Sequence, residues 1–348
     1  MLFRLKIFFI KLGSWEYWPM WVVYFPLAFY YVYLAIKARS LFFFSASNPS
    51  IETGGMFFES KWSIFKLMPC HYYPSTILVE PQDDYTIIEA KLIAAKIHFP
   101  IIAKPDRGER GWRVKKLNHL QALIDYKTQT PVPFLIQSYV DYPVELSIFY
   151  YRHPKSVKGK VTSVTYKKLL SVVGDGVTSI DGLIRKNNRA FLQYLRLKKE
   201  SLINLNEILP FGEERILVPY GNHVLGTMFI NFNHIIDDAL TTSIDTISKN
   251  IEGFYFGRFD LRCASIDDLK EGKNFAILEL NGAGAEPAHI YHPGFSFIEA
   301  QKVLMQHFKM LFDAAKANQQ KGVPYMSYQS YKQTKQLEKA FKLQVQQA

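Results

Sequence analysis

Two short segments with alternating polar and apolar residues constrain the fold of this chain more than any other feature. They are residues 257–262, with the sequence GRFDLR, and residues 276–282, with the sequence AILELNG. Side chains on a β-strand point alternately to opposite faces, so Arg258, Asp260 and Arg262 share one face of the first segment. The apolar residues between them take the other face. Both segments are therefore predicted to be strands.

The second segment places Glu279 and Asn281 on one face in the same way. If the two strands pair, these oxygen-bearing side chains converge with Asp260 beside two guanidinium groups. Hard oxygen ligands suit Mg²⁺, which proteins hold through one or two carboxylates together with substrate phosphates. The arginines would then face phosphate charge that the metal does not neutralise. The alternative is a polar edge strand whose charges are solvated.

Composition and charge narrow the class of protein. With 348 residues, 48% apolar and 21% charged, the chain is globular and long enough for two or three domains. Its formal net charge of +11 favours an anionic partner such as a nucleotide, an acidic substrate or a membrane surface. Nucleic acid is the least favoured partner, because no zinc-finger, RNP-like or helix-turn-helix pattern is present. Cys70 and Cys263 are far apart, which indicates a reducing compartment.

Residues 1–44 differ from the rest of the chain in their richness in aromatic residues. The run from Tyr17 to Ile36 carries no charge, and as a helix it would reach about 30 Å, the thickness of the bilayer hydrocarbon. Pro19 and Pro26 interrupt the run, and Trp and Tyr prefer the headgroup boundary. A spanning helix, an interfacial or re-entrant anchor and a buried soluble helix all remain open. Membrane association is favoured, at the cytoplasmic face.

A second candidate site follows the apolar run that ends at Lys104. The loop after it contains Gly108 and Gly111, and glycines let backbone N–H groups approach phosphate oxygens closely. The pattern matches neither the Walker A motif nor GxGxxG, so a P-loop or Rossmann site is not indicated. Taken alone, a lysine at the end of a strand is usually solvated.

The order of these parts resembles the ATP-grasp superfamily, in particular the D-alanine–D-alanine ligases. A strand ending in Lys104, a glycine loop, a helix, a strand running into residues 137–140, Glu145 on the next strand and the paired polar strands follow in the family's order. Residues 173–190 prompt a further comparison with the ATP-grasp domain of cyanophycin synthetase. The resemblance spans residues 59–316. It implies an α+β fold in which two α/β subdomains clasp ATP, with the N-terminal helical segment added.

The resemblance also implies roles for individual residues. The implied ATP contacts are Lys61, Lys104, the loop glycines Gly108 and Gly111, the hinge residues Gln137, Tyr139 and Val140, and Glu145, which would bind the ribose. The implied ligands of two Mg²⁺ ions are Asp260, Glu279 and Asn281. Arg258 matches the arginine that stabilises developing oxyanion charge, and Lys104 shares in catalysis. His223 is a candidate catalytic residue, with an ordinary loop histidine as the alternative.

The activity implied is ATP-dependent ligation of a carboxylate to an amine. The carboxylate attacks the γ-phosphate, and the amine then displaces phosphate from the acylphosphate. Phosphate transfer to a hydroxyl or carboxylate, and nucleotide binding without turnover, are the alternatives. The expected substrates are a small-molecule or lipid-linked carboxylate and amine. In the loop after Asn281, Glu286 is expected to meet an amine and His289 to line the pocket.

Four segments are expected along the chain. Turn-forming residues at 45–50 and the pair Gly54-Gly55 mark the end of the membrane segment. The predicted division is a membrane-associated segment at 1–44, a subdomain with the lysine and the glycine loop at 45–133, a subdomain with the metal site at 134–318 and a polar tail at 319–348. Residues 150–256 are longer than a minimal ATP-grasp domain requires, and residues 185–199 are predicted to form one basic helix.

Overall fold

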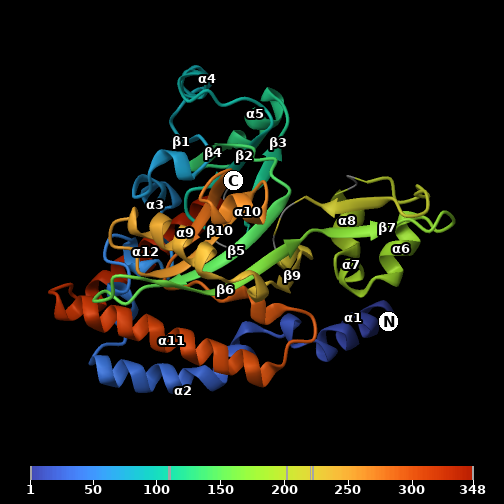
Figure 1. The fold of residues 1–348 in the computed structure, drawn as a ribbon. Coiled ribbons are helices and arrows are strands. Elements are labelled where there is room, and N and C mark those ends of the chain that lie inside the picture. Colours follow the sequence, from blue (N-terminus) through green and yellow to red (C-terminus); the bar gives the residue numbers. More distant parts are fainter. Residues whose placement is uncertain (1, 109–110, 201–202, 220, 222, 347–348) are drawn as a thin grey trace.

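The computed structural model describes residues 2–108, 111–200, 203–219, 221 and 223–346 (Figure 1). Two antiparallel sheets form the body of the molecule, and a smaller sheet with its own helices projects to one side of it. The N-terminal helices lie along the opposite edge from the first sheet. The predicted α+β fold with two main subdomains is confirmed.

The first sheet carries the strand that ends near Lys104. Its strand order is β1-β4-β2-β3, with bounds Thr76–Val79 for β1, Ile101–Pro105 for β2, Lys115–Leu117 for β3 and Phe134–Ser138 for β4. Helices α4 (Tyr85–Ala94) and α5 (Leu120–Thr128) share an apolar core with it. Asp84 begins α4 by accepting a hydrogen bond from the backbone N–H of Ile87, the usual N-cap arrangement.

The second sheet contains the two polar strands. Its order is β11-β10-β5-β6-β9, with bounds Phe275–Asn281 for β11, Phe256–Cys263 for β10, Val144–Tyr151 for β5, Lys160–Lys168 for β6 and Met228–Asn231 for β9. Alternation along β5 sends Ile148 and Tyr150 into a core with α9 (Asp238–Lys249), while Phe149 packs toward α11 (Phe297–Gln320). Short helices α3 (Lys61–Lys66) and α10 (Ile266–Lys270) complete this subdomain.

The projecting lobe is built from the long middle of the chain. Strands β7 (Leu170–Val173) and β8 (Glu214–Val218) pair, and three short helices pack on them around a separate apolar core. These helices are α6 (Ile180–Lys186), α7 (Asn188–Leu192) and α8 (Tyr194–Glu200). The prediction of one basic helix over 185–199 is therefore wrong. Asn187 adopts an extended conformation that ends α6, and its side chain caps α7.

The N-terminal segment forms two helices, α1 (Leu2–Gly13) and α2 (Met20–Ala38), and α2 lies along α11 (Figure 1). The uncharged run therefore begins in a turn, and helix α2 starts only after Pro19. Among the described residues, one helix, Met20–Ala38, is long and apolar enough to cross a membrane, with a mean hydropathy of 1.3. Its buried side chains, including Val23, Leu27 and Leu34, join the protein core.

The structure differs from the predicted division at three places. Helix α3, which lies within the predicted first subdomain, packs in the core of the second sheet. Strand β4 pairs with β1 and β2, so the first subdomain continues past residue 134 to the end of β4. The predicted polar tail contains a helix, α12 (Tyr328–Gln346), which packs on the body: Tyr331 stacks on Phe42, and Phe341 contacts Phe58. Aromatic residues spaced along an otherwise polar helix suffice to dock it, because each buries a large apolar area.

Candidate active site

A cleft of about 720 Å³ lies between the two sheets and is lined by both of them, by the projecting lobe and by the turn between α1 and α2. The implied ATP contacts, metal ligands and catalytic residues all line this cleft: Lys61, Lys104, Gly108, Gly111, Gln137, Tyr139, Val140, Glu145, His223, Arg258, Asp260, Glu279 and Asn281. These residues come from segments far apart in the sequence, and the fold brings them together. Residues 109, 110, 220 and 222, next to predicted site residues, lie outside the described residues.

The predicted pairing of the two polar strands is confirmed. β10 and β11 are antiparallel, with Asp260 opposite Glu279 and Arg258 opposite Asn281. The Nδ2 group of Asn281 donates a hydrogen bond of 3.2 Å to Asp260 Oδ2. A β-bulge follows the Asp260–Glu279 pair and leaves Leu278 without a partner in the register. Bulges of this kind redirect groups beside functional sites, and here the Leu278 carbonyl accepts from Lys104.

Asp260 is buried among cations. Arg258 contacts both of its oxygens, at 3.2 Å from Nε and 3.1 Å from Nη2, and Lys167 Nζ lies 3.3 Å from Oδ1. Burial by itself would raise the pKa of Asp260, but the charges of Arg258 and Lys167 and a hydrogen bond from Ser147 Oγ outweigh it and lower the pKa. Asp260 is therefore a carboxylate at neutral pH.

Lys167 is a site residue that the sequence analysis did not select. Its side chain is 7% exposed and bridges Asp260 and Glu145, with Nζ 3.4 Å from Glu145 Oε1. Burial lowers the pKa of Lys167, yet the two carboxylates outweigh burial and raise it. Residues 161, 163, 165 and 167 of β6 are all buried. Lys167 thus lies on the buried side of β6 and Lys168 on the exposed side, whereas in the sequence neither alternating set of residues is apolar enough to separate the two lysines.

Glu279 is the more accessible of the two carboxylates on this strand pair. Its side chain is 37% exposed, and Lys61 Nζ lies 3.8 Å from its Oε1. Lys61 also donates to the Gly108 carbonyl at 2.5 Å, and it therefore links the start of the glycine loop to β11. Two carboxylates and an amide oxygen on adjoining strands form the kind of hard-oxygen donor set that Mg²⁺ takes when phosphates complete its coordination.

The donor set is small, and substrate oxygens would have to complete it. Among the residues that the structure describes, no group of three or more His, Cys, Asp or Glu side chains is placed to hold a metal ion. Cations outnumber carboxylates around the strand pair, where Lys61, Lys104, Lys167, Arg258 and Arg262 surround Glu145, Asp260 and Glu279. An excess of positive charge in a cleft attracts polyanions. The residues present therefore fit Mg²⁺ bound together with a polyphosphate.

Lys104 is buried at the centre of the cleft. Its Nζ donates to Gln137 Oε1 at 3.0 Å and to the Leu278 carbonyl at 2.8 Å. Burial is the largest influence on Lys104 and lowers its pKa to about 8, although Glu279 opposes this shift. The amide of Gln137 is fixed in turn by Thr76, whose Oγ1 accepts from Nε2 at 2.9 Å. Gln137 thus holds Lys104 in place from the neighbouring strand.

The predicted hinge and ribose residues lie at the end of β4 and the start of β5. Glu145 is paired with Arg262, whose Nε lies 3.0 Å from its Oε2, and Arg262 also donates to the Val140 carbonyl at 3.0 Å. Lys116 lies over the ring of Tyr139, 3.5 Å from the centroid. Arg262 therefore connects the hinge to Glu145, and a ribose contact from Glu145 would share its oxygens with Arg262 and Lys167.

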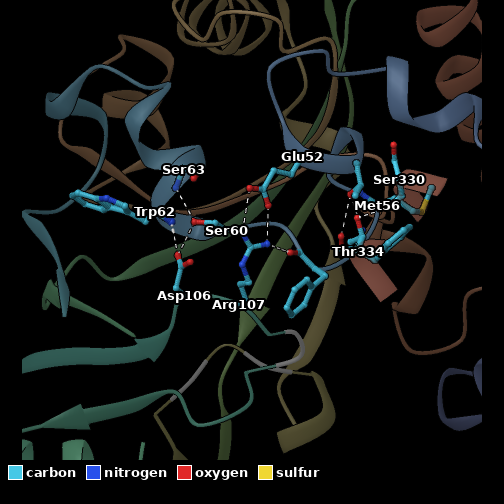
Figure 2. A network of polar contacts seen from close by, with 12 residues as sticks. Glu52, Met56, Ser60, Trp62, Ser63, Asp106, Arg107, Ser330 and Thr334 are labelled. Atoms are coloured by element: carbon cyan, nitrogen blue, oxygen red, sulfur yellow. Dashed lines mark hydrogen bonds and ion pairs between the residues drawn. The ribbon is translucent and has the colours of Figure 1, made fainter. Parts of the chain in front are cut away.

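A polar network fixes the base of the glycine loop (Figure 2). Asp106 Oδ1 accepts from Ser60 Oγ at 3.0 Å and from the Trp62 backbone N–H at 2.8 Å. The next residue, Arg107, makes a two-point ion pair with Glu52, at 2.7 and 3.2 Å. Ser60 in turn caps the helix that presents Lys61. This network thus holds both the glycine loop and Lys61, which faces β10 and β11.

The other end of the cleft is formed partly by the turn between α1 and α2. Glu16 accepts from Arg189 Nη2 at 2.6 Å, and His223 Nε2 lies 3.0 Å from the same Glu16 oxygen. Burial would raise the pKa of Glu16, but the hydrogen bond with His223 and the charge of Arg189 outweigh it and lower the pKa. His223 is thus held at the wall of the cleft by a residue from the N-terminal segment. Arg189 belongs to the segment that resembles cyanophycin synthetase, but nothing in the motif order signalled its pairing with Glu16.

The loop after Asn281 contributes Glu286 to the same end. Tyr24 of α2 and Tyr291 both donate to its carboxylate, the latter at 2.9 Å, and its carbonyl accepts from Arg258 Nη1 at 3.2 Å. The expectation that His289 lines the pocket is wrong. His289 is 4% exposed and bonded to Ser163 Oγ at 2.7 Å, away from the lining residues.

Comparisons with known proteins give matches of limited extent. No family model matches the chain. The carbamoyl phosphate synthase large chain of Thermoanaerobacter sp. (strain X514) is 41% identical over an alignment of 69 residues. The alignment covers 18% of this chain and 6% of that protein.

Several solved structures are similar in fold. A bifunctional glutathione synthetase from Pasteurella multocida is 16% identical with a TM-score of 0.41, covering 72% of this chain and 36% of that one. A D-alanine–D-alanine ligase from Bacillus anthracis complexed with ATP is 12% identical with a TM-score of 0.44, covering 75% and 68%. The VanG D-Ala:D-Ser ligase from Enterococcus faecalis is 14% identical with a TM-score of 0.41, covering 76% and 62%. D-alanine–D-alanine ligases, named by the sequence resemblance, are thus among them.

Proposed function

We propose that this chain is an ATP-grasp ligase that joins a carboxylate to an amine, releasing ADP and phosphate. The observation that carries the proposal is the convergence of Lys61, Lys104 and the Asp260–Glu279 pair in one cleft. Four separate elements, α3, β2, β10 and β11, supply these groups, and the hinge residues 137–140 line the same cleft. Buried cations beside two adjoining carboxylates are the arrangement that phosphoryl transfer to a carboxylate requires, because its catalysis is mostly positioning and charge stabilisation.

Each cation has a distinct place in this reaction. Lys104, fixed by Gln137 and by the bulge carbonyl, contacts the inner phosphates, and Lys61 faces the outer phosphates from the base of the glycine loop. Arg258 lies between Asp260 and the Glu286 carbonyl, where it meets both the transferred phosphate and the acyl oxygen. The carboxylate attacks the γ-phosphate to give an acylphosphate and ADP. The amine then attacks the acyl carbon, and phosphate leaves.

Asp260, Glu279 and Asn281 are the residues that would hold Mg²⁺ in this proposal. The metal supplies charge neutralisation and a template for the phosphate oxygens. To hold the metal, Asp260 would give up part of its contact with Arg258 and Lys167. Glu279, whose nearest cation is 3.8 Å away, needs no such exchange.

The acceptor is proposed to be an amphipathic or lipid-linked molecule that the enzyme meets at a membrane. The support is the one apolar helix, Met20–Ala38, and the fact that the turn before it lines the cleft. A carboxylate or amine that reaches the cleft end formed by Glu16, His223 and Glu286 would pass beside this helix.

Glu279→Gln tests the ligase proposal. Glutamine keeps the shape and one oxygen but removes the charge that matters most as negative charge moves onto the leaving phosphate, so turnover should be lost while the fold is kept. Arg258→Ala should lower kcat on the order of 10²–10³. The measurement is ADP release in the presence of amino acids, short peptides and aminolipids, with a thermal melt of each variant.

A matched control is Glu252→Gln, which changes an exposed carboxylate outside the cleft and should leave turnover unaltered. The mass of the modified acceptor separates an amide product from a phosphorylated one. Full turnover by Glu279→Gln would remove the strand pair from the chemistry.

A further inference from the structure

Helices α1 and α2 present large apolar side chains to solvent. Phe8 and Phe9 on α1 and Trp21, Phe25, Phe29 and Ile36 on α2 are exposed by between 57% and 73%. On α2 the exposed residues, with Val32 at 49% and Tyr33 at 52% included, recur at every third or fourth position, so they form one stripe. Side chains of this size are rarely gathered on a soluble surface unless it binds something. The exposed apolar side chains of α1 and α2 together form the apolar face.

The opposite side of each helix is occupied by the protein itself. Phe3 of α1 packs on Phe191 of the lobe, with ring centroids 4.8 Å apart. On α2, Val23 and Leu27 are each 1% exposed and pack with α11, whose Gln301 donates to the Val23 carbonyl at 3.0 Å. The apolar face therefore points away from the body, and Figure 1 shows both helices along one edge of the molecule.

The charges that α1, α2 and their ends present to solvent have one sign. Arg4, Lys37 and Arg39 are exposed on its helices or at their ends. Glu16 is the only acidic residue between residues 2 and 40, and it is turned inward to Arg189 and His223. An apolar stripe bordered by cations complements a bilayer with anionic headgroups, since the chains take the apolar side and the headgroups take the cations.

We infer that α1 and α2 dock together, lying flat, on the surface of an anionic lipid bilayer. This inference names the membrane partner and is independent of the ligase chemistry. A lone helix that crosses a bilayer meets lipid on all sides, but α2 packs along α11, which carries the ion pair of exposed Lys309 and partly buried Asp313. A bilayer that enclosed α2 would also enclose this pair, and charges inside the hydrocarbon are expensive.

Docking in this orientation gives the cleft a defined position. Tyr17 and Trp18, in the turn between the two docked helices, line the cleft, as does Met20 at the start of α2. Trp15 fixes the turn to the body through a 2.6 Å hydrogen bond from Nε1 to the Phe295 carbonyl. One end of the cleft therefore lies next to the lipid surface.

Vesicle flotation with the purified full-length chain tests the inference. The chain should float with vesicles of phosphatidylcholine mixed with phosphatidylglycerol, and less with phosphatidylcholine alone or at high salt. A Trp21→Glu/Phe25→Glu double variant should lose at least about tenfold in bound fraction, because two charges replace interfacial aromatic rings. Phe211→Glu is the matched control, since Phe211 is 88% exposed on the lobe and away from the apolar face.

Three outcomes would overturn the inference. Equal flotation of the double variant and the parent would show that the apolar face is not the contact. A parent that ignores all vesicles but sediments as a dimer, with the double variant monomeric, would assign the face to a second copy of the chain. Resistance of the membrane-bound parent to alkaline carbonate would indicate a spanning helix. Extraction by carbonate, together with loss in the double variant alone, supports flat docking.

Discussion

At the scale of single residues, the most specific prediction concerns the contribution of Lys104 to ATP binding. Lys104→Ala should weaken ATP binding, since the loss of a charge-assisted hydrogen bond costs about 1.5–3 kcal/mol, or about 10- to 100-fold in affinity. The amine is 6% exposed and fixed by two acceptors, so little reorganisation is needed when phosphate arrives. Isothermal titration of ATP with Mg²⁺ present measures the effect.

The matched control is Lys66→Ala, which removes an exposed lysine of α3 that does not line the cleft. ATP affinity should be unchanged in this variant. If both lysine variants bind ATP like the parent while remaining folded, Lys104 is a structural lysine that satisfies the bulge carbonyl and nothing more.

Residue-scale prediction from the sequence succeeded where strand alternation determines the geometry. Asp260, Glu279 and Asn281 were placed on one polar surface from a period of two, and the register bears this out. Glu16 and Arg189 were missed because their pairing joins residues far apart in the chain, and no local pattern reports such a contact. The bulge at Leu278 was equally invisible, although its carbonyl positions Lys104.

At the scale of elements, the packing of α11 on the second sheet predicts a dependence of stability on pH. His307 is buried between them: Nδ1 lies 2.8 Å from the Val303 carbonyl and Nε2 2.9 Å from Thr162 Oγ1. A carbonyl only accepts, so Nδ1 carries the proton and Nε2 accepts from the hydroxyl. Burial lowers the pKa of His307 from its ordinary value of 6.5 to about 4.

The direction of this pH dependence follows from the fact that His307 is neutral in the folded chain. Below pH 6.5 the unfolded chain gains a proton at His307 that the folded chain does not, so stability is full above 6.5 and falls as pH approaches 4. At pH 5 the loss is about 2 kcal/mol. Melting curves at pH 7 and pH 5 should show a smaller difference for His307→Gln than for the parent. His98→Gln, at an exposed histidine, should keep the parent's difference; equal differences in all three proteins would contradict the expectation.

Element prediction failed where the pattern was charged rather than apolar. The basic run 185–199 predicts one helix, but the structure has a break at Asn187. The Asn187 side chain is more favourable as a helix cap than inside a helix. The polar composition of residues 319–348 predicts a tail, yet a few aromatic residues dock α12 on the body. One of them, Phe341, contacts Trp112 of the glycine loop.

At the scale of the whole molecule, the order of motifs predicted two subdomains around a cleft, but not how residues 1–44 join them. Composition marked this segment as separate, since its apolar and aromatic content is that of a membrane segment. The structure shows one helix serving two surfaces: Leu34 and Ala35 of α2 enter the core with Phe43, while Phe29 and Ile36 remain outside. Composition reports the sum of the two faces, and only the fold separates them.

Removal of residues 1–44 should therefore unfold the chain rather than release an intact body from the membrane. The deletion strips Phe43 and Leu34 from the core and leaves Arg189, whose side chain is 8% exposed, without Glu16. Each large apolar side chain lost from a core costs about 2–5 kcal/mol, and total stability is about 5–15 kcal/mol, so several such losses exceed it. Circular dichroism and thermal melting of the truncated chain measure the outcome. The Trp21→Glu/Phe25→Glu variant, altered on the outer face alone, should melt within a few degrees of the parent, which separates the structural side of α2 from its docking side. A truncated chain that melts cooperatively at the parent's Tm would show that α2 is an independent anchor.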